Sequence, residues 1–193
     1  MLKTQIQQFI NEHQNNLQIG KEEIGYLEKH QDTFEENIFY KVLDSKLRFS
    51  DAYIERSDKE TESLIANESF SFLNQSIDYL KKHKNEFIFL ESDWLQLIGV
   101  DAISLEADDV FNTYDVMLGL KLQKKYQSLI REFLSNNLHG DHATFDLLFS
   151  HEDGLWNLNF ALNDVDGFKE DISFNEAYQL IYHLLFQLAE IAE

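Results

Sequence analysis

The sequence predicts a mainly helical α+β domain with a small antiparallel sheet, in which a C-terminal β-hairpin is covered by a C-terminal helix. Three observations support this fold class. Amphipathic stripes follow three capping-box patterns, two runs of alternating apolar and polar residues lie between 144 and 162, and the chain has no proline and only seven glycines. One compact domain, 1–193, is expected, with a helical part at 1–85 and a mixed part at 86–193.

Three helices are expected in the helical part. The first covers residues 2–16, where apolar residues recur at steps of three or four. The other two begin at capping boxes, in which a hydroxyl residue and a glutamate three positions later satisfy free amides at a helix start. These boxes are Thr33 with Glu36 and Ser57 with Glu60, and they predict helices to about Leu47 and Lys84.

The next segment is expected to hold a strand and a long helix. The brief aromatic run at 86–90 favours extended backbone, and Ser92 with Asp93 restarts a helical turn. Beyond Glu106, apolar residues in steps of three, four or seven predict a third long helix, which ends at Gly140.

The C-terminal part is predicted to form a hairpin and a helix. Residues 144–150 and 156–162 alternate between apolar and polar side chains, and the polar residues 151–154 form the turn between them. A third capping box, Ser173 with Glu176, opens a helix with a wide apolar face. Because an isolated hairpin is marginally stable in water, this helix is expected to cover it.

The charge of the chain limits its partners. It has 35 acidic and 16 basic residues and a formal charge of -19, which repels the phosphate backbone of nucleic acids. Direct nucleic-acid binding is therefore not expected, and a protein partner with a basic surface is. The absence of cysteine excludes disulfides, thiolate ligands and cysteine nucleophiles, and favours a cytoplasmic location. The first 16 residues do not resemble a signal peptide, and no apolar run approaches the length of a membrane span.

The acidic residues are unevenly distributed. Residues 151–193 hold nine acidic residues and Lys169 alone, whereas residues 1–150 hold 26 acidic and 15 basic residues. An acidic recognition face is therefore predicted in the hairpin turn and in the loop from 163 to 171. The predicted partner-binding residues are Glu152, Asp153, Asp164, Asp166, Glu170, Asp171 and the aromatic residue Trp94, which lies in an irregular stretch.

A short run of potential metal ligands lies at His139, Gly140, Asp141 and His142. With the two preceding residues it is similar to the H-x-H-x-D-H motif of metallo-β-lactamase-like hydrolases, with Asn137 in place of the first histidine. That resemblance implies a metal-dependent hydrolase on an αββα sandwich, and the predicted helices lack the repeated strands of that fold. We favour the alternative that His139 and Gly140 end the long helix and that the next two residues begin a turn.

Other catalytic and ligand-binding patterns are missing. The stretch from Asn163 to Gly167 resembles a calcium loop, but Leu162 and Ser173 occupy the positions where the EF-hand requires its first and last ligands. No nucleophile elbow, Walker A loop or dinucleotide fingerprint occurs. The sequence predicts no catalytic residue, no resident metal and no cofactor.

Our leading functional interpretation is a non-catalytic, acidic, cytoplasmic protein that binds another protein, as an inhibitor, an immunity factor or a regulatory adaptor does. In general build it resembles small acidic bacterial immunity proteins. Two alternatives remain open: a metal-dependent enzyme that uses His139, Asp141 and His142, and an acidic mimic of nucleic acid that occupies the basic groove of a DNA-binding protein. The oligomeric state and the identity of the partner remain open as well.

Overall fold

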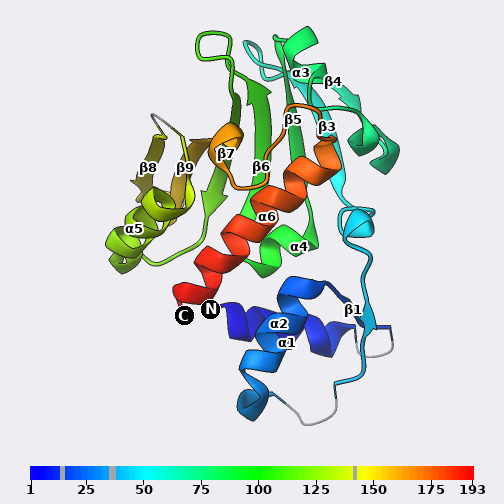
Figure 1. Cartoon of the computed structure of the whole chain (residues 1–193), viewed down its shortest axis with the longest axis vertical. Coiled ribbons are helices and arrows are strands. Elements are labelled where there is room, and N and C mark those ends of the chain that lie inside the picture. Colours follow the sequence, from blue (N-terminus) through cyan, green and yellow to red (C-terminus); the bar gives the residue numbers. More distant parts are fainter. Residues whose placement is uncertain (14–15, 35–37, 141–142) are drawn as a thin grey trace.

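The computed structural model describes residues 1–13, 16–34, 38–140 and 143–193. Its main element is a seven-stranded sheet with the order β4-β3-β5-β6-β7-β9-β8, in which every pair of neighbours is antiparallel (Figure 1). The strands of this sheet are β3 (Tyr53–Asp58), β4 (Leu64–Asn67), β5 (Glu86–Glu91), β6 (Val100–Ala107), β7 (Tyr114–Leu120), β8 (Phe145–Ser150) and β9 (Leu155–Ala161).

Helices of very different lengths accompany the sheet. They are α1 (Leu2–Glu12), α2 (Lys21–Lys29), α3 (Tyr79–Lys82), α4 (Asp93–Leu97), α5 (Gln127–Asn137) and α6 (Phe174–Ile191). The long helix α6 runs diagonally over one face of the sheet, while α1 and α2 lie beyond one end of the strands (Figure 1). A short parallel pair of strands, β1 (Gln18–Ile19) and β2 (Lys41–Val42), connects the segment before α2 to the segment that precedes the main sheet. None of the helices described here is long and apolar enough to cross a membrane.

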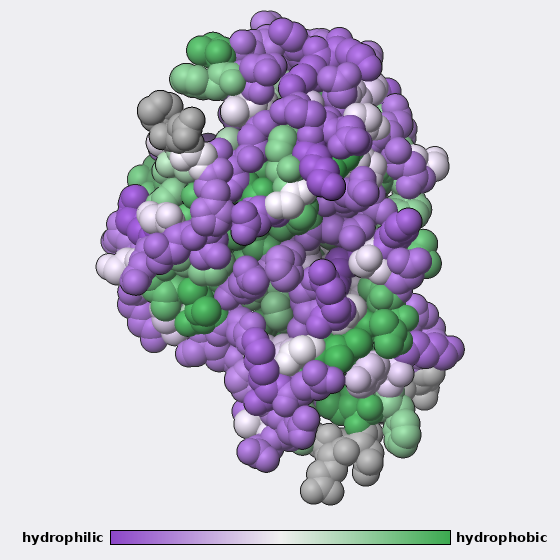
Figure 2. Space-filling model, in the orientation of Figure 1, coloured by the Kyte–Doolittle hydropathy of each residue, from purple (hydrophilic) through white to green (hydrophobic). Residues whose placement is uncertain are grey.

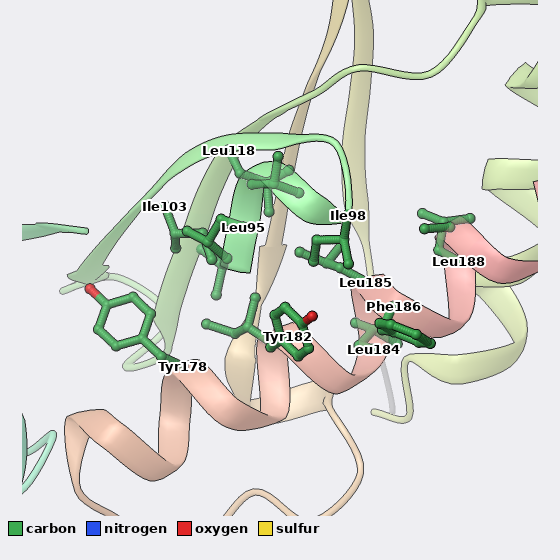
Figure 3. Close-up of a cluster of buried hydrophobic side chains, with 14 of the residues drawn as sticks. Leu95, Ile98, Ile103, Leu118, Tyr178, Tyr182, Leu184, Leu185, Phe186 and Leu188 are labelled. Carbon is green, nitrogen blue, oxygen red and sulfur yellow. The ribbon is translucent and has the colours of Figure 1, made fainter. Parts of the chain in front are cut away.

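The core lies between the sheet and α6. In strands β5, β6, β7 and β9, buried side chains alternate with less buried ones, and the buried apolar set points to the side of α6. Figure 3 shows side chains of α6 packed against Ile103 and Leu118 of the sheet and against Leu95 and Ile98 at α4. The hydroxyl of Tyr178 also donates a hydrogen bond to the carbonyl of Ile88 over 3.2 Å, which fixes the helix to the sheet.

The predicted fold class is wrong, because the structure is built on a large sheet and not on helices with a small sheet. The hairpin is confirmed as β8 and β9, but these strands form one edge of the larger sheet. The strand at 86–90, the helical turn after Ser92, the N-terminal helix and the capping box of α6 are also confirmed, although the first helix ends at Glu12.

The helix predicted from Ser57 to Lys84 is wrong. Ser57 lies in β3 and Glu60 in the turn that follows, so the capping-box pattern occurs there without a helix. The rest of the segment contains β4, a 3-10 turn at Phe70–Asn74 and the single turn α3. Their apolar residues follow one another closely along the chain, and the combined spacing of Leu64, Ile65, Phe72, Leu73 and Leu80 imitates a helical stripe.

The helix predicted beyond Glu106 and ending at Gly140 is correct only in its last part. The strand β7 occupies Tyr114–Leu120, and α5 begins at Gln127. A step of four residues returns to the same face in a helix and also in a strand, because four is an even number. The pair Tyr114 and Leu118 therefore fits both structures, and the steps of two that include Val116 distinguish the strand.

The helix predicted from Thr33 to Leu47 is wrong in its described part. Thr33 ends a 3-10 turn that begins at Gln31, and its expected capping partner, Glu36, lies outside the described residues. The later residues form β2 and a second 3-10 turn at Ser45–Leu47.

Candidate functional site

The two faces of the main sheet have different surroundings. On the face of α6, the register aligns Ile88, Leu105, Val116 and Phe160, and all four are buried. On the opposite face, which we call the open face, the adjacent residues of the same strands are half-buried or exposed. The open face consists of Glu55, Phe87, Phe89, Asp101, Ser104, Glu106, Asp115, Met117, Asp146, Leu148, Asn157 and Asn159.

The centre of the open face is apolar. Phe87, Phe89 and Met117 are partly exposed, and among the described residues they belong neither to the buried core nor to the side chains packed against it. Their neighbours Ser104 and Asn159 are short and polar, so they leave the aromatic and thioether groups accessible. A group of partly exposed apolar side chains at the centre of a sheet face is a candidate interaction surface.

Carboxylates surround this centre. Strand register places Glu55, Phe89, Ser104, Met117, Asn159 and Asp146 in one row across six strands. The row begins and ends with an acidic residue, and with a spacing of about 4.8 Å between strands it is roughly 24 Å long. A neighbouring row runs from Phe87 through Glu106 and Asp115 to Ala161.

The charge of the open face is only partly compensated. Lys59 forms an ion pair with Glu106 at 3.2 Å, and Lys121 forms one with Asp101. Within the part of the chain that the structure describes, Glu55, Asp115 and Asp146 have no basic side chain in salt-bridge contact. Among the described residues, the face therefore carries three carboxylates without a salt-bridge partner around an apolar centre, although Lys59 acts on Asp115 from a greater distance.

The surroundings of the Asp115 carboxyl raise its pKa. Burial raises its pKa and the negative charge of Asp108 raises it further, while the hydroxyl of Thr113, which donates a hydrogen bond over 3.1 Å, and the positive charge of Lys59 oppose that effect.

The acidic residues predicted as a single recognition face lie in two places. Asp164, Asp166, Glu170 and Asp171 follow β9, at the end of the sheet where the β6–β7 turn also lies. Glu152 and Asp153 are exposed in the turn that precedes β9, at its other end. The seven residues of β9 separate the two groups by roughly 23 Å.

Several of these predicted residues have partners within the chain. Glu170 pairs with Lys81 at 2.8 Å, and Asp153 accepts a hydrogen bond from the hydroxyl of Ser150 at 2.7 Å. The exposed carboxylate of Asp166 lies 3.6 Å from the imidazole of His139. Burial raises the pKa of Asp164. Asp171 is exposed beside the N-terminus of α6.

The structure places only part of the possible metal site. Asp141 and His142 lie outside the described residues, so the ligand set with His139 stays a prediction. Among the residues that are described, no three histidine, aspartate or glutamate side chains converge as metal ligands do. The amide of His139 donates a hydrogen bond to the carbonyl of Asp164 over 2.7 Å, which ties the end of α5 to the loop after β9.

Trp94 is half-buried and stacks within a polar network. The guanidinium of Arg48 lies 4.7 Å from the centre of its ring and 4.1 Å from that of Tyr182. Arg48 also donates hydrogen bonds to Glu23 at 2.9 and 3.1 Å and to Glu22 at 2.8 Å. The hydroxyl of Tyr182 completes the network by donating to Glu23 over 2.6 Å. These contacts join α2 to α6, so they hold the structure together.

A surface pocket of about 500 Å³ lies beside this network. Basic residues such as Lys21, Lys169 and His183 line it together with acidic residues such as Glu22 and Asp171. Glu22 and His183 lie 3.2 Å apart, so part of the lining is already paired. The pocket offers no uniform charge to a ligand.

Exposed apolar residues outside the open face form separate groups, such as Phe39, Tyr40 and Val42 beside β2 and Val110 and Phe111 in the β6–β7 turn. The side of the molecule that carries α6 has a mostly hydrophilic surface with separate hydrophobic patches (Figure 2). Phe39 is 85% exposed next to β2, and Phe111 is 77% exposed in the β6–β7 turn. These two residues lie at different ends of the molecule and do not form one surface.

Sequence reasoning missed the open face, because its residues come from six strands and no single segment shows more than two or three of them. The chain matches no model of a known protein family, and it shows no significant similarity to any curated protein or solved structure.

Proposed function

We propose that this is a non-catalytic protein that binds another protein through its open face, in the manner of an inhibitor, an immunity factor or a regulatory adaptor. The observation that carries the proposal is the apolar centre of Phe87, Phe89 and Met117, surrounded by carboxylates that have no salt-bridge partner among the described residues. An apolar centre with a polar rim is the usual composition of a protein interface. The excess of carboxylates selects a partner with a basic surface.

The alternatives have less support. In the nucleic-acid mimic, the partner is a DNA-binding protein and the carboxylates stand in for phosphates, which accounts for the charge but not for the apolar centre. The metal-dependent enzyme depends on a ligand set of which only His139 is described. A cytoplasmic location stays part of the proposal.

The proposal is tested with two variants. In each of them three carboxylates are neutralised, either on the open face or elsewhere on the surface. One variant carries Glu55→Gln, Asp115→Asn and Asp146→Asn on the open face. The control variant carries Glu28→Gln, Glu132→Gln and Asp51→Asn, all at exposed positions elsewhere, so that both variants have the same net charge. Each purified protein is immobilised and exposed to lysate of the source cells, and bound proteins are quantified by mass spectrometry.

A true partner should be recovered by the wild-type and control proteins and lost with the open-face variant. With the recovered protein purified, its affinity should fall as salt concentration rises, because part of the attraction is electrostatic. Equal recovery by both variants would place the binding elsewhere or show that it depends on net charge alone. Recovery of no protein by the wild type would contradict the proposal as a whole.

A further inference from the structure

We infer that the open face receives an amphipathic helix of the partner, with an apolar stripe flanked by lysine and arginine residues. This inference rests on the proposed function and specifies the part of the partner that makes contact. It follows from the hydrogen-bonding state of the sheet, from the charge of the chain and from the arrangement of the exposed side chains.

Hydrogen bonding favours a helix over an extended segment. In the interior strands of the sheet, backbone amides and carbonyls are directed to the neighbouring strands, so the open face presents side chains only. An extended peptide that lay on this face would bury its own backbone groups without partners, which is unfavourable. A helix satisfies its backbone groups internally, and the opposite face of the same sheet already binds one, α6.

Charge excludes the other simple occupants. A second copy of the chain has the same charge of -19, and its open face would bring further carboxylates against those of the first. Anionic lipid surfaces and nucleic acids are repelled for the same reason. A segment with basic side chains is the occupant that complements Glu55, Asp115 and Asp146.

The arrangement of side chains defines the pattern that this helix needs. Phe87, Phe89 and Met117 would contact residues spaced at i, i+3, i+4 and i+7 on the apolar stripe. The carboxylates at the two ends of the long row would meet basic residues near the ends of the helix. A row of roughly 24 Å corresponds to a helix of about 16 residues.

The test uses two synthetic 18-residue peptides of identical composition. One places leucines on a helical stripe with lysine and arginine on both flanks, and the other is a scrambled isomer that has no stripe. Their affinities for the full-length wild-type chain are measured by calorimetry, and circular dichroism follows helix formation. The striped peptide should become helical and bind at least about tenfold more tightly than the scrambled one, a difference of about 1.4 kcal/mol.

Variants of the full-length chain then locate the binding site. Phe89→Thr with Met117→Thr should weaken the striped peptide about tenfold, because both apolar contacts are removed from strands that tolerate threonine well. The control Phe111→Thr removes an exposed phenylalanine outside the open face and should leave the affinity unchanged. Thermal unfolding verifies that each variant is folded, and Phe87→Thr replaces the double variant if that one is not.

Each outcome decides the inference. Equal binding of the two peptides, or no binding of either, would overturn it, as would a loss of affinity in Phe111→Thr that equals the loss in the open-face variant. If the peptides fail while the lysate partner still depends on Glu55, Asp115 and Asp146, the proposed function stands and only the helical occupant is wrong.

Discussion

The two faces of the main sheet are formed by consecutive residues of the same strands, yet their side chains differ in how deeply they are buried. Ile88, Leu105 and Val116 are buried under α6, whereas their sequence neighbours Phe89, Ser104 and Met117 are partly exposed. The covered face supplies the apolar burial that stabilises the fold. The open face contributes less to that burial, so the stability of the fold constrains its side chains less, and they are available for the proposed binding.

The largest difference in stability is expected between the buried ion-pair network that joins α2 to α6 and an exposed ion pair on the open face. Replacing Arg48 by leucine leaves Glu23 buried without its cation, so the free energy of unfolding should fall by about 3–5 kcal/mol. Replacing Lys121 by methionine breaks an exposed pair with Asp101 on the open face and should cost no more than about 1 kcal/mol. Urea denaturation of both variants measures the difference. A mild effect of Arg48→Leu would show that the buried network does not hold α2 and α6 together.

Truncation of apolar side chains should give the next largest contrast. Leu105→Ala removes a fully buried side chain beneath α6, and about 2–5 kcal/mol of stability should be lost. Met117→Ala removes a side chain of similar size from the open face, where it packs against no core residue, and about 1 kcal/mol or less is expected. Thermal or urea unfolding compares the two. Similar losses would mean that the open face is packed as tightly as the covered one.

The sequence allowed the elements with an unambiguous period to be predicted. The alternation of β8 and β9 and the wide apolar stripe of α6 hold over six to eighteen residues, which is enough to distinguish a strand from a helix. In β7 the steps of four fit both periods, and in the region around β3 and β4 short elements follow one another too quickly for any period to develop. Because β7 and the region around β3 and β4 were assigned to helices, the predicted fold class was mainly helical, whereas the structure contains a large sheet.

The candidate site could not be predicted from the sequence, because it depends on which strands are neighbours. Phe89 and Met117 are 28 positions apart in the chain and approach each other only through the pairing of β5 with β6 and of β6 with β7. Counting acidic residues along the chain drew attention to the loop after β9, where the local excess is greatest. The carboxylates of the open face are spread over several strands, and a count along the chain does not reveal them.

The smallest expected effect on stability concerns Asp115. It tests whether a carboxylate proposed to bind the partner lowers the stability of the free protein. Burial raises the pKa of this carboxyl in the folded protein, so its ionisation opposes folding. The penalty is absent below the ordinary pKa of an aspartate, about 3.9, and is fully present once the pH exceeds the raised pKa. Asp115→Asn should therefore be slightly more stable than the wild type at pH 7, and the two should converge at about pH 3.

Thermal unfolding between these two pH values measures the effect, with Asp146→Asn as a control from the exposed end of the same face. If the proposed basic partner binds here, the same substitution should weaken its binding, because a favourable attraction to the Asp115 carboxylate is lost. A binding surface that costs stability in the free protein is expected to behave in this way, gaining stability and losing affinity together. If Asp115→Asn were less stable than the wild type at neutral pH, the Asp115 carboxylate would stabilise the folded protein, and the open face would not reduce stability at this position.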